Sequence, residues 1–453
     1  MTAPLHFHTI TELAPLVAAG RLASEDLTRA CLAEIAAHDD ALRAFITVLG
    51  DDALVQARAL DAETAAGRCR GPLHGIPISL KDLIDQRGVP TTAASRVREG
   101  HVAAGDATVT ARLREAGAVF VGKTNLHEFA FGTTSDDTAY GAVHNPHDPE
   151  RSPGGSSGGS AVAIVTGMSI ASIGTDTGGS IRIPSAACGT VGLKPTWGEL
   201  PCDGIVPLSR SLDHVGPLAR SVADAWLLYL VMRGDATAAR WPLPMRRATR
   251  GLRLGIPRAY FHDMLDDEVR GRFAESLTWL RQAGAEMVDV TIPHAAWTAP
   301  VYSHASLPEA SAYHAATIAA CPERYTPNVR LRIEMGRYLL AEDHARAQVA
   351  REVLRADVDR ALAGCDALAL PTLPIPAPPI GAGTVDVAGT PESVRNMMLR
   401  LTQLFNLTGH PAISIPAGST EGGLPCGFQL VGRRHDTEGL LATAAACEPH
   451  VTA

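Results

Sequence analysis

The chain has 453 residues, of which 46% are hydrophobic, so it can bury a large core. Its 40 basic and 48 acidic residues give a net charge of −8, and no basic run indicates direct nucleic-acid binding. The apolar stretches are shorter than the ~18 residues that span a bilayer, and the N-terminus lacks a signal-peptide pattern, so we expect a cytoplasmic protein that does not bind membranes.

The N-terminal region predicts helices, followed by alternating strands and helices. Residues 9–66 have a helical pattern, with apolar positions at Leu27, Cys31 and Ile35. From about residue 72, short β-prone runs alternate with helical runs: "GIPISLKDL" as a strand, "ATVTARLREAG" as a helix and "AVFVGK" as a strand. This alternation predicts an α/β protein with a mainly parallel or mixed sheet.

The C-terminal half continues the same pattern. We predict strands in "GLRLGIP", "EMVDVTI", "DALALPT" and "PAISIPAG", with helices over 266–285, 328–364 and 437–450. The Pro- and Gly-rich stretch 371–391 is interpreted as a rim loop, because strand-like runs flank it. We therefore expect one domain over residues 1–453, with 296–330 as an irregular, cap-like region lining the pocket.

Two glycine- and serine-rich clusters interrupt the most apolar part of the chain: "SPGGSSGGSAVAIVTG" at 152–167 and "GTDTGGSIRIPSAACG" at 174–189. Such composition alone is typical of a flexible linker. The clusters lack the Lys of a phosphate-binding loop and the spacing of a dinucleotide fingerprint. No G-x-S-x-G motif lies in a strand–turn–helix context, so a nucleophile elbow is not predicted either.

The second cluster is suited to acyl transfer. Glycines allow backbone N–H groups to converge at a helix start, and such donors stabilise an oxyanion. The candidate donors are the amides of Thr177, Gly178, Gly179 and Ser180, and the Ser180 hydroxyl is the candidate nucleophile. Its base could be His214, the nearest histidine, or Lys81, which follows an apolar run and would have a lowered pKa if it were buried.

These segments together resemble the amidase signature family. The resemblance covers "GPLHGIPISLKDLID", both clusters, "SLDHVGPLARSVADA", "FNLTGHPAISIPAG" and "GLPCGFQLVG", and therefore spans nearly the whole chain. It implies a central mixed sheet covered by helices on both faces, with a signature core at about 70–220. It also implies a Ser–cis-Ser–Lys unit, with Ser180 as nucleophile, Ser156 as bridging serine after a cis peptide bond, and Lys81 as base.

Other residues near these motifs have less specific roles. Ser157 could act in the relay or satisfy local backbone, and Asp176 and Arg182 are expected to pair or to brace the nucleophile loop. Phe131, Gly132 and Thr133 are candidates for lining the acyl side of the pocket, by resemblance. Lys123 is also a family feature, for which we favour a structural role. We predict no metal site and no cofactor.

The resemblance implies a serine hydrolase that cleaves the C–N bond of a carboxylic amide, with aryl esters and carbamates as further candidate substrates. The alternatives are the glutaminase subunit of a glutamyl-tRNA amidotransferase and a non-catalytic scaffold. That subunit carries an acidic residue where this chain has Leu399, although Arg330 or Arg332 could hold a carboxylate. Leu399 could line a less polar pocket or belong to a helix core. We expect a monomer or homodimer that binds a small amide, ester or carbamate.

Overall fold

The computed structural model describes residues 4–235 and 248–451 of the chain. Its centre is a mixed sheet of eleven strands in the order β1-β3-β2-β4-β6-β5-β12-β13-β9-β7-β8. The strands of this sheet are β1 (Phe45–Val48), β2 (Pro77–Lys81), β3 (Val119–Thr124), β4 (Ala171–Asp176), β5 (Val191–Lys194), β6 (His214–Ala219), β7 (Arg253–Pro257), β8 (Glu286–Val290), β9 (Ala367–Pro371), β12 (Ala412–Ser419) and β13 (Pro425–Val431). The predicted α/β class with a mixed sheet is confirmed.

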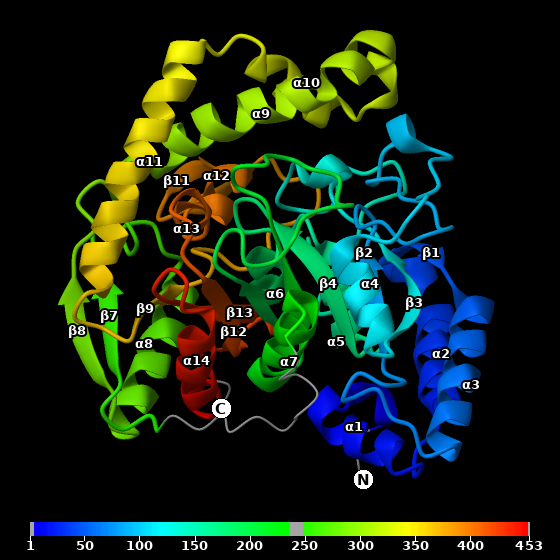
Figure 1. The fold of residues 1–453 in the computed structure, drawn as a ribbon. Helices are drawn as coiled ribbons and strands as arrows, with labels where there is room; N and C mark the ends of the chain where they lie inside the picture. The colour runs from blue at the N-terminus through cyan, green and yellow to red at the C-terminus, as the bar shows by residue number, and fades with distance from the viewer. Residues whose placement is uncertain (1–3, 236–247, 452–453) are drawn as a thin grey trace.

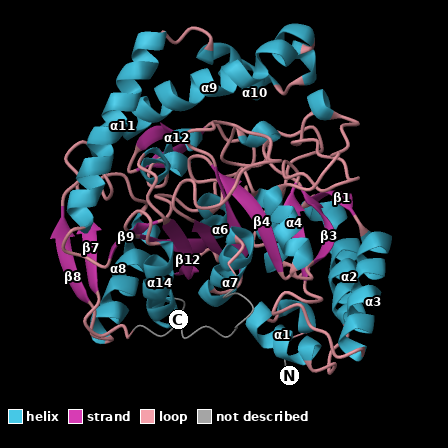
Figure 2. Ribbon diagram, viewed as in Figure 1, coloured by secondary structure: helices cyan, strands magenta, loops and turns pink. Residues whose placement is uncertain are grey.

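Helices flank this sheet, so the chain forms a single α/β domain (Figures 1 and 2). The α-helices are α1 (Ile10–Ala18), α2 (Ser24–Leu42), α3 (Gly50–Ala65), α4 (Thr108–Glu115), α5 (Gly158–Val165), α6 (Arg182–Cys188), α7 (Val222–Arg233), α8 (Asp267–Gln282), α9 (Thr298–Ala320), α10 (Pro327–Gly336), α11 (Ala341–Leu362), α12 (Val394–Leu399), α13 (Gln403–Leu407) and α14 (Thr437–Val451). Helices α9, α10 and α11 form an arch above the sheet in Figure 1.

The strands β2, β3 and β4 carry the amine candidates and lead to the second glycine-serine cluster. Every residue of all three strands is buried, as expected for parallel strands covered on both faces. β2 pairs in parallel with β3 and β4, so the carboxyl ends of the three strands lie at one edge of the sheet. Leu80 pairs with Lys123 and Lys81 with Thr124, which places the two lysine side chains on opposite faces.

The buried apolar side chains form two clusters. The larger one packs the N-terminal half of the sheet and the helices around it, including α2, α5 and α7. The second joins α6, α9, α11, α12 and α13 beneath the arch, with Tyr302, Leu354 and Leu399 among its members. The second cluster therefore attaches the arch to the domain next to the carboxyl end of β4.

Four local predictions need correction. The segment 9–66 is not all helix, because β1 pairs antiparallel with β3 at the edge of the sheet. The region 296–330 is not irregular, since α9 spans Thr298–Ala320; Pro308 and scattered polar residues obscure its helical pattern in the sequence. The stretch 328–364 is two helices, α10 and α11. The rim loop contains a hairpin of β10 (Thr384–Val387) and β11 (Thr390–Ser393).

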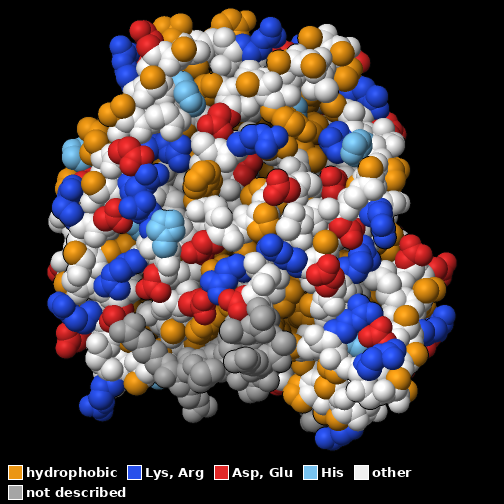
Figure 3. Space-filling model, in the orientation of Figure 1, with side chains coloured by type: hydrophobic (Ala, Val, Ile, Leu, Met, Phe, Trp, Pro, Cys, Tyr) orange, Lys and Arg blue, Asp and Glu red, His pale blue; other side chains and the backbone are white. Residues whose placement is uncertain are grey.

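The surface in Figure 3 carries basic and acidic side chains interspersed with one another, without a continuous field of one sign on this face. Among the described residues, no helix is both long and apolar enough to cross a bilayer.

Candidate active site

Lys81 is the last residue of β2, and its side chain is completely buried. Its Nζ lies 2.7 Å from Ser156 Oγ and 2.8 Å from Thr175 Oγ1, both of which are neutral hydroxyls. Burial lowers the pKa of Lys81 to about 7, although the charges of Asp176 and Asp213 act to raise it. Near neutral pH a large fraction of this amine is therefore uncharged and able to accept a proton.

The first glycine-serine cluster is tightly packed, in contrast to a linker. The Gly155–Ser156 peptide bond is cis, as the resemblance implies. The Ser156 carbonyl accepts hydrogen bonds from the His127 N–H and the Ser135 hydroxyl, both at 3.2 Å. A Cβ on Gly155 would lie 2.7 Å from the Thr134 amide nitrogen, so only glycine fits there. This packing fixes the backbone that presents the Ser156 hydroxyl to Lys81.

The second cluster connects β4 to α6 and contains the nucleophile candidate. Ser180 retains 6% of its exposure, and its carbonyl accepts a hydrogen bond from the Ser157 N–H at 3.2 Å. None of the amides of residues 177–180 donates a hydrogen bond to another described residue. A Cβ on Gly178 would meet Tyr302 Oη at 2.7 Å, and one on Gly179 would meet Thr402 Oγ1 at 2.3 Å. The loop thus combines close packing with amide donors that an oxyanion could use.

Lys81 and Ser156 are in direct contact, whereas Ser180 is linked to them through the backbone. Ser157 donates its N–H to Ser180, and its hydroxyl donates to the Thr175 carbonyl at 3.2 Å. The Ser180 hydroxyl forms no hydrogen bond with a described residue, including Ser156. Of the two roles considered for Ser157, the structure therefore shows the satisfaction of local backbone.

Asp176 and Arg182 form a buried ion pair that braces the nucleophile loop. Arg182 Nη2 and Nε lie 3.0 and 3.1 Å from the two carboxylate oxygens of Asp176. Asp176 also accepts the Ile181 N–H, and Arg182 donates to Gln429 and Asn406, both at 2.7 Å. Arg182 holds the pKa of Asp176 well below its usual range, against the opposing effect of burial. His214 lies on this side of β4 and contacts Lys194, not Ser180.

The candidate substrate residues occupy different positions around the site. Phe131 is buried, with its ring centroid 5.8 Å from the Arg395 guanidinium, and Gly132 packs against the His127 ring. Thr133 lines a cavity. Leu399 is buried in the cluster under the arch, and its Cδ2 would lie 3.0 Å from a Cβ on Gly178. Leu399 is thus both a core residue and a neighbour of the nucleophile loop.

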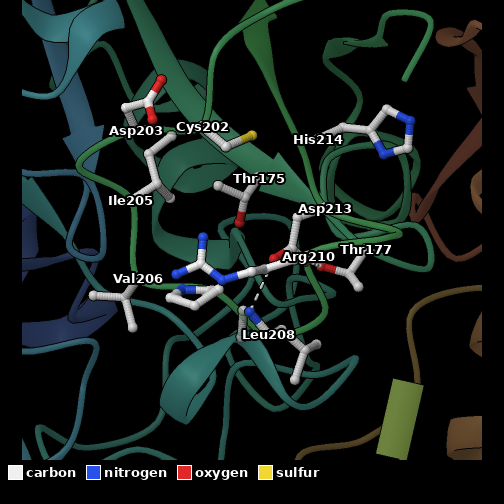
Figure 4. A pocket seen from close by; sticks show the side chains of 12 residues that line it. Thr175, Thr177, Cys202, Asp203, Ile205, Val206, Leu208, Arg210, Asp213 and His214 are labelled. Carbon is white, nitrogen blue, oxygen red and sulfur yellow. Dashed lines mark hydrogen bonds between the residues drawn. The ribbon is translucent and has the colours of Figure 1, made fainter. Parts of the chain in front are cut away.

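Two cavities adjoin the segment 127–134. The smaller, of about 140 Å³, contains Thr175 and Thr177, whose hydroxyl donates to Asp213 at 2.6 Å (Figure 4). Burial raises the pKa of Asp213 to about 6. The larger cavity, of about 460 Å³, is lined by His127, Thr133, Thr134, Asp136, Asp137, Asn328, Arg332, Ile380, Gly381, Ala382, Gly383, Ser393, Val394 and Arg395. Substrate space therefore exists on two sides of this segment.

Several residues near the reaction centre were not predicted from the sequence. Thr175 is the second partner of the Lys81 amine, and its position in "GTDTGGS" close to Ser180 could have suggested it. Tyr302, Arg395 and His127 reach the site through tertiary packing. Each is far from the two serine clusters or outside them, so the sequence offers no local signal for its position.

The comparisons with known proteins agree with this geometry. A family model described as Amidase matches residues 26–441. The chain is 40% identical over 470 residues to the A-type subunit of the glutamyl-tRNA(Gln) amidotransferase of Anaeromyxobacter sp. (strain K), covering 95% of this chain and 94% of that protein. The chain therefore belongs to the amidase family, and it has the α/β fold of amidase signature enzymes.

Solved structures of amidases are similar along the whole chain. One described as an amidase has a TM-score of 0.92 and 37% identity, covering 98% of this chain and 100% of that one. The native peptide amidase of Stenotrophomonas maltophilia has a TM-score of 0.83 and 32% identity, covering 98% and 97%. Amide hydrolysis is thus the activity that the family membership supports.

Proposed function

We propose that this chain hydrolyses a carboxylic amide through an acyl-enzyme formed on Ser180. The observation that carries this proposal is the Lys81 amine, buried without a carboxylate partner within 4.0 Å among the described residues and 2.7 Å from the Ser156 hydroxyl. Burying an amine in this way is costly, and the arrangement suits a base better than a structural cation.

In the proposed cycle, neutral Lys81 takes the proton of Ser156 as Ser156 takes the proton of Ser180. The Ser180 oxygen then attacks the amide carbonyl, and amides of residues 177–180 bind the oxyanion. Ser156 returns a proton to the leaving nitrogen as the C–N bond breaks, which matters because an amide anion is a poor leaving group. Water, deprotonated by the same relay, attacks the acyl-enzyme and releases the carboxylic acid and free Ser180.

Aryl esters and carbamates are further proposed substrates. Their carbonyl carbons accept the same attack by Ser180, and an aryl alkoxide needs less protonation to leave than an amine does. The chain is proposed to act alone, as a monomer or homodimer, on a small molecule.

The glutaminase subunit of a glutamyl-tRNA amidotransferase is the second candidate, favoured by the 40% identity to relatives of that name. The position of Leu399 disfavours it, because an apolar side chain beside Gly178 cannot pair with the ammonium group of glutamine. Glutamine hydrolysis that appears only when partner subunits are added would favour this candidate. A non-catalytic scaffold is disfavoured, because Lys81, Ser156 and Ser180 are all buried around one site.

Trapping of the acyl-enzyme tests the proposal. A fluorophosphonate probe is expected to label wild-type protein at Ser180, and Ser180→Ala is expected to lose both labelling and turnover of a 4-nitroanilide. Ser185→Ala is the matched control, because its hydroxyl is buried in α6 without a hydrogen-bond partner among the described residues. Turnover that survives in purified Ser180→Ala protein would refute the proposal.

A further inference from the structure

The larger cavity contains a guanidinium without a protein partner. Arg395, on the first turn of α12, forms no hydrogen bond or ion pair with a described residue; it lies near the Phe131 ring, whose centroid is 5.8 Å away. Its side chain is half-buried and lines the cavity wall. An arginine cannot become neutral by losing a proton in a protein, so an unpaired guanidinium in a cavity favours binding of an anion.

Arg332 provides a second positive charge in the same cavity. Its Nη1 donates to the Phe131 carbonyl at 2.7 Å, and no carboxylate oxygen of a described residue lies within 4.0 Å of it. Arg330, two positions earlier on α10, instead pairs with Glu334 at 2.8 Å and lies outside this cavity. Of the two arginines considered from the sequence, Arg332 is thus the one that faces the cavity.

The acidic side chains of the cavity do not neutralise these arginines directly. Asp136 accepts hydrogen bonds from the Thr134 hydroxyl at 2.5 Å and the Gly381 N–H at 3.0 Å. Asp137 lies 3.9 Å from His127 Nε2, too far for a hydrogen bond. Burial and the nearby Arg332 charge keep the pKa of His127 low, at about 3, so this ring adds no positive charge near neutral pH. The two guanidinium groups remain the cavity's unpaired charges.

The arginines are connected to the reaction centre through two aromatic side chains. Phe131 contacts both: its carbonyl accepts from Arg332 and its ring faces Arg395. Tyr302, whose pKa is raised to about 12 by burial and lowered somewhat by Arg395, approaches Gly178 in the nucleophile loop. A molecule bound at the arginines can thus extend toward Ser180.

We propose that the amide substrate carries a carboxylate group, which Arg395 binds with assistance from Arg332. The planar guanidinium pairs with a carboxylate through two parallel hydrogen bonds, which gives both charge and orientation. Leu399 offers an apolar contact between this anionic end and the loop of Gly178. The inference rests on the proposed amide hydrolysis for its substrate, but anion binding is measurable without turnover.

Two matched pairs of substrates test the inference by replacing a methyl group with a carboxylate. On the acyl side, the 4-nitroanilide of succinic acid is compared with the 4-nitroanilide of butyric acid. On the leaving side, 4-acetamidobenzoate is compared with 4-methylacetanilide. In at least one pair, the carboxylate form is expected to have a kcat/KM at least about tenfold higher in wild-type protein, because ionic hydrogen bonds are strong.

Arg395→Met is expected to lower that preference by about 10- to 100-fold, mainly through KM, because the lost contact binds ground state and transition state alike. Arg395→Lys is expected to restore part of it, and Arg330→Met, which removes a charge paired with Glu334, is the matched control. The ratio of two substrates cancels differences in the amount of folded protein. An unchanged ratio in Arg395→Met for both pairs would overturn the inference.

A binding experiment separates this inference from the proposed function. Ser180→Ala protein is titrated calorimetrically with succinamate and with butyramide, in the presence and absence of the Arg395→Met change. Tighter binding of succinamate that depends on Arg395 supports the anion site even if the wild-type protein hydrolyses neither anilide. Equal binding of both amides overturns the anion site, whether or not the anilides are hydrolysed.

Discussion

Two buried lysines on neighbouring strands of the sheet have opposite environments. Lys81 on β2 and Lys123 on β3 are both fully buried and project from opposite faces. Lys123 Nζ lies 3.0 Å from a carboxylate oxygen of Asp82 and also donates to Thr91 and the Pro90 carbonyl. Lys81 contacts only the hydroxyls of Ser156 and Thr175.

The difference shows how one sheet keeps one amine charged and another available as a base. Burial lowers the pKa of both amines, but Asp82 directly opposes this effect at Lys123. A neutral hydroxyl can exchange a proton with an amine, whereas a carboxylate holds the proton in an ion pair. We therefore interpret Lys123 as a structural cation and Lys81 as the catalytic base.

The largest expected effect is on turnover. Lys81→Met should lower kcat/KM by about 10³- to 10⁴-fold, because the relay loses its proton acceptor. Lys123→Met should retain kcat per folded molecule within about tenfold of wild type, measured with active-site titration by a fluorophosphonate probe. Comparable losses of kcat per folded molecule in both variants would remove the distinction between the two lysines.

The second prediction concerns stability and has opposite signs for the two lysines. Lys123→Met should lower the free energy of unfolding by about 3–5 kcal/mol, because Asp82 would stay buried and unpaired. Lys81→Met should raise it by up to about 2 kcal/mol at pH 7, as removal of a strained functional group often does. Denaturant unfolding measures both values.

The stability gain of Lys81→Met also has a predicted pH dependence. The pKa of Lys81 is about 7 in the folded protein and 10.5 ordinarily, so between these values the unfolded chain binds more protons. Wild-type stability should therefore rise with pH from about 7 to 10.5 relative to the variant. A gain that is the same at pH 7 and pH 10 would argue against a depressed pKa at Lys81.

The third prediction concerns the pH dependence of the reaction. The base must be uncharged, so kcat/KM should fall about tenfold for each pH unit below the Lys81 pKa of about 7 and level off above it. Initial rates with a neutral anilide, measured from pH 5 to 9 at constant ionic strength, report this titration. A flat profile over that range would contradict the assignment of Lys81 as the base.

The smallest expected effect concerns the second partner of the Lys81 amine. Thr175→Val removes a hydroxyl that accepts a hydrogen bond from Nζ, so the charged amine is less well solvated. The inflection in kcat/KM should move to lower pH by up to about one unit, with a loss of rate of about threefold at the plateau. Thr110→Val is the control, since that hydroxyl is buried without a hydrogen-bond partner among the described residues. A shift in both variants would show that any buried threonine has the same effect.

The sequence predicts the parts of the site that local patterns encode. The apolar run before Lys81 indicates its burial, and the resemblance identifies Ser156, Ser180 and the cis peptide bond before Ser156, which the structure contains. The alternating runs predict the mixed sheet. Each of these features depends on residues that are close together in the chain.

Features that depend on packing between distant segments were not predicted. The four-residue β1 exists because it pairs with the edge of β3, and α9 is stabilised by contacts under the arch despite Pro308. Arg395 lies more than 200 residues after Ser180, and α12 brings it to the cavity. Sequence patterns carry no direct information on such long-range contacts.

The position of the arch has an evolutionary consequence. Lys81, Ser156 and Ser180 all precede residue 220, whereas Tyr302, Arg332 and Arg395 all follow residue 296. A single genetic crossover between these stretches would transfer the cavity arginines to another chain and leave its proton relay intact. Homologous enzymes built on this plan could therefore exchange substrate preference by recombination without rebuilding the chemistry.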